Sequence, residues 1–218
     1  GTYNVTVTAS GDYDGSAQAV MTIKNAAVDT SALTFNVADA TYGDALNVTQ
    51  PDASAYPAGT AATVTYTGTG IYTPQTEQPK NAGKYTATLT IEGANYNGAY
   101  LTSDFTINKA VINVMPNPAN RAYGELNPAF TMQYDGFKYN DDVSAIMIEP
   151  TGYTDASMSS GVGTYDIIPS GGYADNYTFN YQKGTLTVGE ASGGNFYIFG
   201  GQSNPYVGNK FTLTAYYN

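Results

Sequence analysis

The chain has 218 residues and a formal net charge of −10, with 21 tyrosines and 24 glycines but no cysteine, histidine or tryptophan. Disulfides, zinc sites built from Cys or His, and His-containing catalytic triads are therefore excluded. Only eight basic residues are present, so nucleic-acid binding, which needs clustered Lys and Arg, is not expected. No apolar run is long enough for a membrane span, and we expect no membrane insertion.

Residues 1–25 are predicted to be the C-terminal half of a truncated repeat module. Tyr3, Val5 and Val7 alternate with polar residues, and so do Ala17, Ala19 and Met21 beyond the turn at residues 10–15. This alternation predicts two strands with one buried face. Two strands cannot form a core alone, so docking on the next module is one way to bury that face. Because the chain opens inside the pattern, we expect it to be part of a longer protein.

Residues 26–110 are predicted to be a complete β module. Leu33, Phe35 and Val37 indicate its opening strand, and residues 41–44 (Thr-Tyr-Gly-Asp) indicate a turn. Further strands are predicted at residues 62–66, 84–91 and 99–107.

Residues 111–188 are predicted to be a second complete module. Its opening strand is expected at residues 111–115, and the turn at residues 122–125 (Ala-Tyr-Gly-Glu) repeats the earlier one after 81 residues. Residues 140–147 are expected to begin a helical turn capped by Asn140 or Asp141. Residues 178–188 predict two short strands about Lys183-Gly184. Residues 189–218 are predicted to be a linker followed by a partial module or a terminal hairpin.

Two tyrosines mark the repeat. Tyr3, Tyr85 and Tyr165 are 82 and 80 residues apart. Each follows glycine and one further residue, which is threonine before Tyr3 and Tyr165 and lysine before Tyr85. Tyr13, Tyr96 and Tyr177 are spaced by 83 and 81 residues. These steps predict an all-β chain of tandem small Ig-like β-sandwich modules in an elongated array. In such a sandwich the first tyrosine hydrogen-bonds back to the preceding corner, and the residue two further on, here Val5, Ala87 or Ile167, faces the core.

Three phrases carry a family likeness: residues 80–110, residues 122–128 and residues 163–188. On these residues the second module resembles the MBG domain of the "YGX" type. The first is similar to a related MBG or bacterial Ig-like repeat, although its Tyr42-Gly43 turn lacks the following proline. The resemblance implies large, repetitive, adhesin-like bacterial proteins that are extracellular, either secreted or on the cell surface, and it implies no catalytic residues. A β-grasp fold, as in some mucin-binding repeats, is the alternative, and it requires a helix across the sheet.

No catalytic, cofactor-binding or metal-ligating residue is predicted, and the chain is not expected to be an enzyme. Two acidic pairs, Asp12 with Asp14 and Asp141 with Asp142, suit either calcium at a module junction or ordinary turn chemistry. A Lys–Asn isopeptide bond would need a buried lysine. The tyrosines most expected to be exposed, and so to stack on sugar rings, are Tyr197, Tyr206, Tyr216 and Tyr217.

Three functions stay open at this point. The first is a structural stalk that projects a binding head from a bacterial surface, with neighbouring modules of the same chain as its partners. The second is an adhesive module that binds mucin or host or dietary glycans, and the third is an accessory domain of a secreted glycoside hydrolase. The junctions at residues 24–28 and 107–111 are too short for flexible linkers, so a stalk of this kind is expected to bend little.

Overall fold

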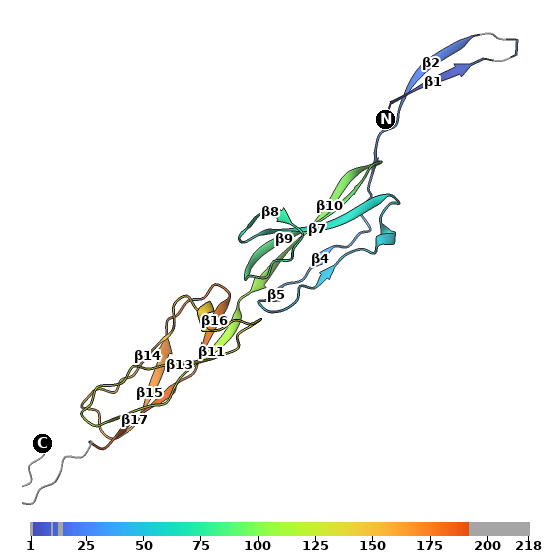
Figure 1. Cartoon of the computed structure of the whole chain (residues 1–218). Coiled ribbons are helices and arrows are strands. Elements are labelled where there is room, and N and C mark those ends of the chain that lie inside the picture. The colour runs from blue at the N-terminus through green and yellow to red at the C-terminus, as the bar shows by residue number, and fades with distance from the viewer. Residues whose placement is uncertain (1, 10, 13–14, 192–218) are drawn as a thin grey trace, which may run out of the picture. The chain divides into compact units, whose positions relative to one another are not determined.

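A computed structural model describes residues 2–9, 11–12 and 15–191. These residues form strands, drawn as arrows in Figure 1, and two single-turn 3₁₀ helices. The predicted all-β sandwich-type fold is confirmed. The β-grasp alternative lacks its helix throughout this described part of the chain. The same residues contain no helix with the length and apolar character needed to cross a membrane. By their internal contacts the described residues divide into unit 1, within 2–110 with 175–177, and unit 2, 111–174 with 178–191.

Unit 1 consists of a separate hairpin and a sheet with a small second layer. In chain order its elements are β1 (Thr2–Thr8), β2 (Ser16–Thr22), β3 (Ala26–Ala27), β4 (Asn36–Val37), β5 (Ala40–Thr41), β6 (Val48–Thr49), the 3₁₀ turn η1 (Ala53–Ala55), β7 (Thr60–Gly68), β8 (Ile71–Gln75), β9 (Gly83–Gly93) and β10 (Tyr96–Asn108).

The sheet of unit 1 is built around β9, which lies between β7 and β10. Tyr85, Ala87, Leu89 and Ile91 alternate with polar residues along β9, and all four are at most 4% exposed. This period of two places one face of the strand in the core, as the sequence predicts. The loop that carries β4 lies on this face, where the Val37 amide donates to the Ser103 hydroxyl of β10 at 2.9 Å.

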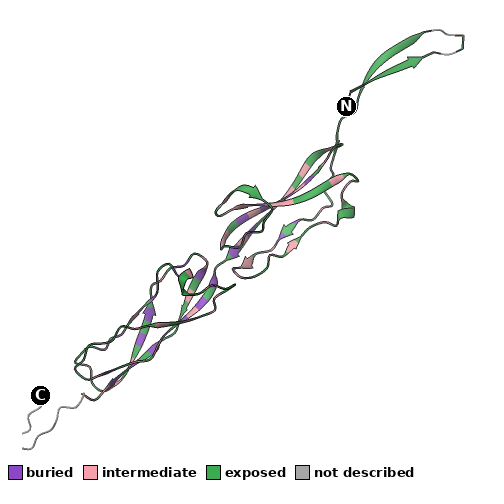
Figure 2. Cartoon of the chain, in the orientation of Figure 1, coloured by how far each residue is buried: buried purple, intermediate pink, exposed green. Residues whose placement is uncertain are grey.

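The hairpin β1–β2 forms where it is predicted, but its buried face is not observed. Every residue of both strands is exposed, and Figure 2 shows both strands in the colour of exposed residues. Val5, predicted to face a core, is 37% exposed. The prediction was wrong because no second layer covers this face among the described residues. The two strands also pair only with each other among the described strands.

Unit 2 contains two sheets. In chain order its elements are β11 (Ala110–Pro116), β12 (Ala119–Ala122), β13 (Met132–Asp135), the 3₁₀ turn η2 (Val143–Ala145), β14 (Thr151–Tyr153), β15 (Gly163–Ser170), β16 (Tyr177–Tyr181) and β17 (Gly184–Gly189). The first sheet has the order β13-β11-β16, and the second has the order β12-β17-β15-β14.

The core of unit 2 lies between these sheets. Ile112 and Val114 of β11 are fully buried from one side, and Ile167 of β15 and Leu186 of β17 from the other. The sheets approach closely, because a Cβ added at Gly184 would lie 2.6 Å from Cβ of Pro116. Glycine at position 184 is therefore required by the packing of β17 against β11.

Two local predictions also need correction. The strand predicted from Leu33, Phe35 and Val37 is only the two-residue β4, and Leu33 and Phe35 lie in the loop before it, although Phe35 and Val37 are buried. The helical turn of unit 2 is η2, and its cap is Asp142 rather than Asn140 or Asp141. Asp142 is in the extended conformation that a cap requires, and its carboxylate accepts from the Ser144 amide.

Candidate functional site

The corner tyrosines are structural in both units. Tyr85 donates its hydroxyl to the Asn81 carbonyl at 2.9 Å, and Tyr165 donates to the Gly161 carbonyl at 2.8 Å. Each bond reaches back four residues and holds the corner that leads into β9 or β15. The residues two positions on, Ala87 and Ile167, are fully buried. The predicted corner bond is therefore confirmed at Tyr85 and Tyr165, where both hydroxyls serve the fold.

The Tyr-Gly turns are equivalent in the two units. Gly43 and Gly124 have φ of 101° and 88°, a left-handed conformation that glycine adopts without strain. The tyrosine amide before each glycine donates to the last strand of its unit, Tyr42 to the Asn108 carbonyl and Tyr123 to the Gly189 carbonyl. The turn therefore fastens the beginning of each unit to its final strand.

A buried arginine braces this turn in unit 2. Arg121 is 6% exposed. Its Nε donates to the Asn127 side-chain oxygen at 2.7 Å, and its two terminal nitrogens donate to the carbonyls of Ala122 and Ser157. Asn127 in turn donates to the Ala156 carbonyl at 2.7 Å. The sequence pattern does not predict this clamp, whose only signal is an arginine just before the turn in a chain with few basic residues.

The acidic pairs behave as turn residues where they are described. The Ser144 hydroxyl and amide, which hydrogen-bond to Asp142, hold the pKa of its carboxyl below the usual value. Asp52 plays the same part in η1 with Ser54. Asp14 lies outside the described residues, which leaves the pair with Asp12 open. Among the residues that are described, no three acidic side chains gather as a metal site would require.

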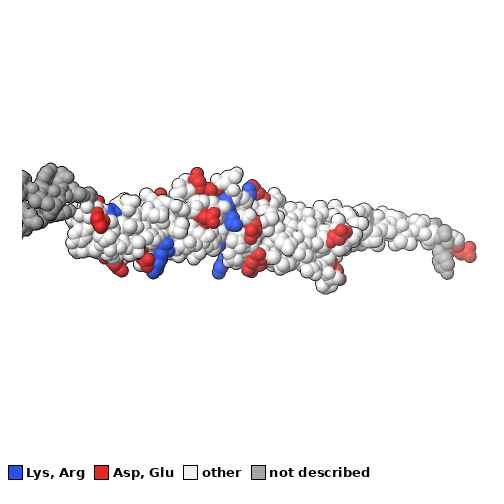
Figure 3. All heavy atoms as spheres, turned by 90° about the horizontal axis from the view of Figure 1, so that it is seen from below, with Lys and Arg blue, Asp and Glu red and all other residues white. Residues whose placement is uncertain are grey.

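The lysines of the described residues do not meet the requirement for an isopeptide bond. Lys24, Lys80, Lys84, Lys109, Lys138 and Lys183 are all exposed. Lys183 is paired with Asp166 at 2.6 Å, and this contact raises the pKa of the lysine. On the face that Figure 3 shows, basic side chains are scattered among acidic ones over a mostly uncharged surface.

Shallow hollows occur in both units. One hollow in unit 1, of about 420 Å³, is lined in part by Asp39 and Asp104. Both are already engaged, because Asp39 accepts from the Thr106 amide and Asp104 from the Thr86 hydroxyl. One oxygen of each carboxylate thus takes part in a hydrogen bond between neighbouring segments of unit 1.

Unit 2 has a smaller groove of about 210 Å³ over β11, β13 and the residue after β16. Its lining is rich in side-chain amides and carboxylate, with one aromatic ring: Asn113, Met115, Gln133, Tyr134, Asp135 and Gln182. The Tyr134 hydroxyl donates to Glu149, and burial, followed by the charge of Glu149, raises the pKa of that hydroxyl. Groups of this kind can hydrogen-bond to the hydroxyls of a polyol.

The tyrosines predicted to form an exposed cluster, Tyr197, Tyr206, Tyr216 and Tyr217, lie outside the described residues. Among those described, Tyr72 and Tyr100 are the most exposed, at 92% and 74%. They stand on β8 and β10, and neither lines the hollows above.

Comparison with known proteins agrees with this geometry. No curated protein matches the chain. Residues 112–187, which span most of unit 2, match the family model of the MBG domain (YGX type), a structural repeat domain that occurs in bacterial surface proteins.

Proposed function

We propose that the chain is a non-catalytic spacer segment of a secreted or surface-anchored, adhesin-like bacterial protein, in which repeated modules carry a binding head away from the surface. The observation that carries this proposal is the recurrence of one construction in both units. A corner tyrosine, a Tyr-Gly turn and a buried alternating strand recur at equivalent positions. Each of these features stabilises a module, which is what a spacer needs. The surface-protein family of residues 112–187 supports the same reading.

The experiment places residues 26–188 between a small binding head and an anchor on a bacterial surface. The cells carry a surface polymer layer that keeps receptor-coated beads from reaching a head attached directly to the anchor. Capture of receptor-coated beads is expected to rise when the segment is inserted, and to rise again with two copies in series. Capture that does not depend on the number of copies would contradict a spacer function.

Glycan binding is the second candidate, and the amide-rich groove of unit 2 is the observation that favours it. The side-chain amides of Asn113, Gln133 and Gln182 line it beside the Tyr134 ring. The Asn113 oxygen already accepts from Asn180 and the Gln133 nitrogen donates to Asn117, and the Asn113 nitrogen, the Gln133 oxygen and the Gln182 amide supply further donors and acceptors. A glycan-array and mucin screen with and without calcium tests this function. Reproducible binding that is lost in Gln133→Ala but kept in Tyr100→Ala, an exposed tyrosine outside the groove, would replace the spacer proposal with an adhesive one.

A further inference from the structure

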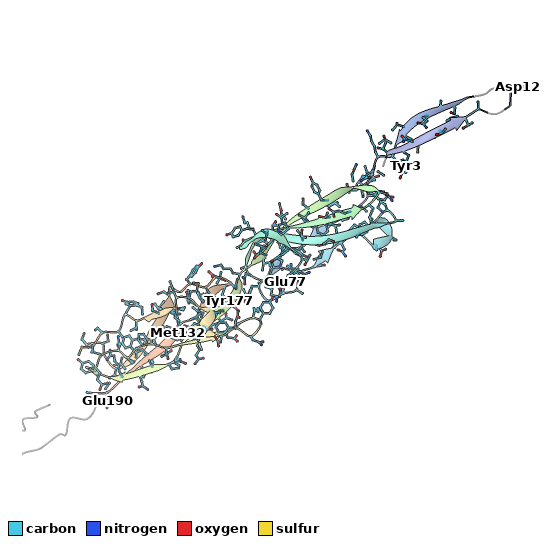
Figure 4. The ribbon with its side chains drawn as sticks, turned by 45° about the horizontal axis from the view of Figure 1, so that its top comes forward. Tyr3, Asp12, Glu77, Met132, Tyr177 and Glu190 are labelled. Carbon is cyan, nitrogen blue, oxygen red and sulfur yellow. The ribbon has the colours of Figure 1, made fainter. Side chains whose placement is uncertain are left out.

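The two strands of the N-terminal hairpin present one wholly apolar face. In the register of β1 and β2, Tyr3 pairs with Met21, Val5 with Ala19 and Val7 with Ala17. Directly paired residues point to the same side of a sheet, so all six side chains share one face. Tyr3 is 52% exposed, Val7 63% and Met21 48%. Figure 4 marks Tyr3 at the start of this hairpin and Asp12 in its turn.

The same register recurs in the cores of both units. Three cross-strand pairs begin with the repeated tyrosine: Tyr3↔Met21, Tyr85↔Phe105 and Tyr165↔Leu186. Two residues further on, each strand pair sets an apolar residue opposite a small one: Val5↔Ala19, Ala87↔Ser103 and Ile167↔Gly184. The face defined by these pairs is covered by a second layer in β9–β10 and β15–β17, and it is bare in β1–β2.

The two units also show what pairs with the outer edges of this strand pair. On one edge a short strand lies parallel to the second strand, β5 on β10 and β12 on β17. On the other edge a strand lies antiparallel to the first, β7 on β9 and β14 on β15. In both units these added strands precede the strand pair in the chain, and the part of a unit before its strand pair is here called its opening half. The β1–β2 hairpin has no such neighbour among the described strands.

We propose that the apolar face and both edges of the β1–β2 hairpin form a docking site for the opening half of another module of the same type. The occupant adds one strand parallel to β2 and one antiparallel to β1, and it covers the face with alternating apolar residues. Neither strand of the hairpin carries a charge, which suits an apolar, backbone-paired partner. A second copy of the hairpin is a poorer occupant, because two stacked faces would leave all four edges unpaired.

The test uses the full chain, labelled with ¹⁵N, and a synthetic peptide of residues 110–162, which is the opening half of unit 2. Amide shifts are expected at residues 2–8 and 16–22 as the peptide is added, together with new protection of these amides from hydrogen exchange. Shifts confined to β15 and β17 would mean that the peptide only exchanges into unit 2, and they would overturn the proposal.

A matched pair of variants assigns the binding to the apolar face. Val5→Asp is expected to weaken the peptide at least about tenfold, since it would bury an unpaired carboxylate. Thr6→Asp, on the opposite face of the same strand, is expected to weaken it less than about twofold. Equal losses in the two variants would exclude the apolar face as the site.

Val5→Asp could also weaken binding by unfolding the hairpin, so a second test changes the peptide and leaves the chain unaltered. Ile112 and Val114 of the opening half are fully buried in unit 2, so a peptide with Ile112→Asp and Val114→Asp is expected not to bind the unaltered chain. Undiminished binding by that peptide would contradict the proposal. So would a concentration-dependent dimer of the chain alone that is lost in Val5→Asp, because a second copy would then be the occupant. None of these outcomes depends on the spacer function.

Discussion

Units 1 and 2 build the same turn with different chemistry beneath it. The backbone bonds of the Tyr-Gly turn are equivalent, but unit 2 has Arg121 and Asn127 at the positions where unit 1 has Ala40 and Leu46. A buried polar clamp in one unit is thus replaced by apolar residues in the other. Both partners change together, because either partner alone would leave a buried polar group without its hydrogen bonds.

The units differ in the same compensating way across the strand pair. Unit 1 sets Ala87 opposite Ser103, whereas unit 2 sets the larger Ile167 opposite Gly184. The glycine is required because Pro116 lies where its side chain would be. Each core is therefore filled by a matched set of residues, and single exchanges between the units are expected to be unfavourable.

The largest effect is expected from Ile167→Ala, which installs the residue of unit 1 in unit 2. Truncating this fully buried side chain leaves a cavity and should lower the free energy of unfolding of unit 2 by about 4 kcal/mol. Hydrogen exchange resolved by residue measures each unit separately. The control is Ile168→Ala at the next, 39% exposed position, where a loss below about 1 kcal/mol is expected. Similar losses at both positions would contradict the packing described.

Arg121→Met is expected to be nearly as damaging. It leaves the Asn127 side chain and the Ser157 carbonyl without their donor, and should destabilise unit 2 by about 3 kcal/mol. The double variant Arg121→Met, Asn127→Leu removes both polar partners and should recover part of that loss in chemical denaturation. If the double variant loses more free energy of unfolding than the two single variants lose together, the two residues do not compensate for each other.

The sequence was informative wherever local rules decide the structure. Alternation located β7, β9, β10 and β17, and the spacing of Tyr85 and Tyr165 predicted their corner bonds. It failed at Val5, because burial depends on strands that are distant along the chain. It also missed the Arg121 clamp, whose acceptors on Asn127 and Ser157 are brought together only by the fold. The groove of unit 2 could not be predicted for the same reason, since β11 and β13 meet only in the sheet.

The corner bonds allow a finer comparison. Tyr85 is 4% exposed, whereas Tyr165 is only partly buried. Tyr85→Phe should therefore cost about 1.5 kcal/mol and Tyr165→Phe about 0.5 kcal/mol, because water can replace the bond at the more exposed site. Thermal unfolding measures both, with Tyr100→Phe on the surface as a control that should be neutral. A larger loss for Tyr165→Phe would reverse the inferred difference in solvation.

The smallest effect is expected from alkaline pH. Burial raises the pKa of Tyr85, and burial together with Glu149 raises that of Tyr134, above the ordinary value of 10.0. The folded chain then holds these protons more tightly than the unfolded chain. Their contribution is complete below about pH 10 and is lost as the pH rises through the folded-state pKa values. The melting temperature should fall over this range, and less steeply in Tyr85→Phe, Tyr134→Phe; an unchanged slope in that variant would contradict the assignment.

In each unit an early short strand, β5 or β12, pairs in parallel with the last strand, and this pairing has a consequence for biosynthesis. Ala40 pairs with Ile107 and Ala119 with Leu186, so in both units the closing contact joins residues 67 positions apart. The first of these strands leaves the ribosome long before its partner exists. The short strands β5 and β12 must therefore stay unpaired until the last strand of their unit has been made, so each unit can close only at the end of its synthesis. A chain built this way acquires its structure one whole module at a time.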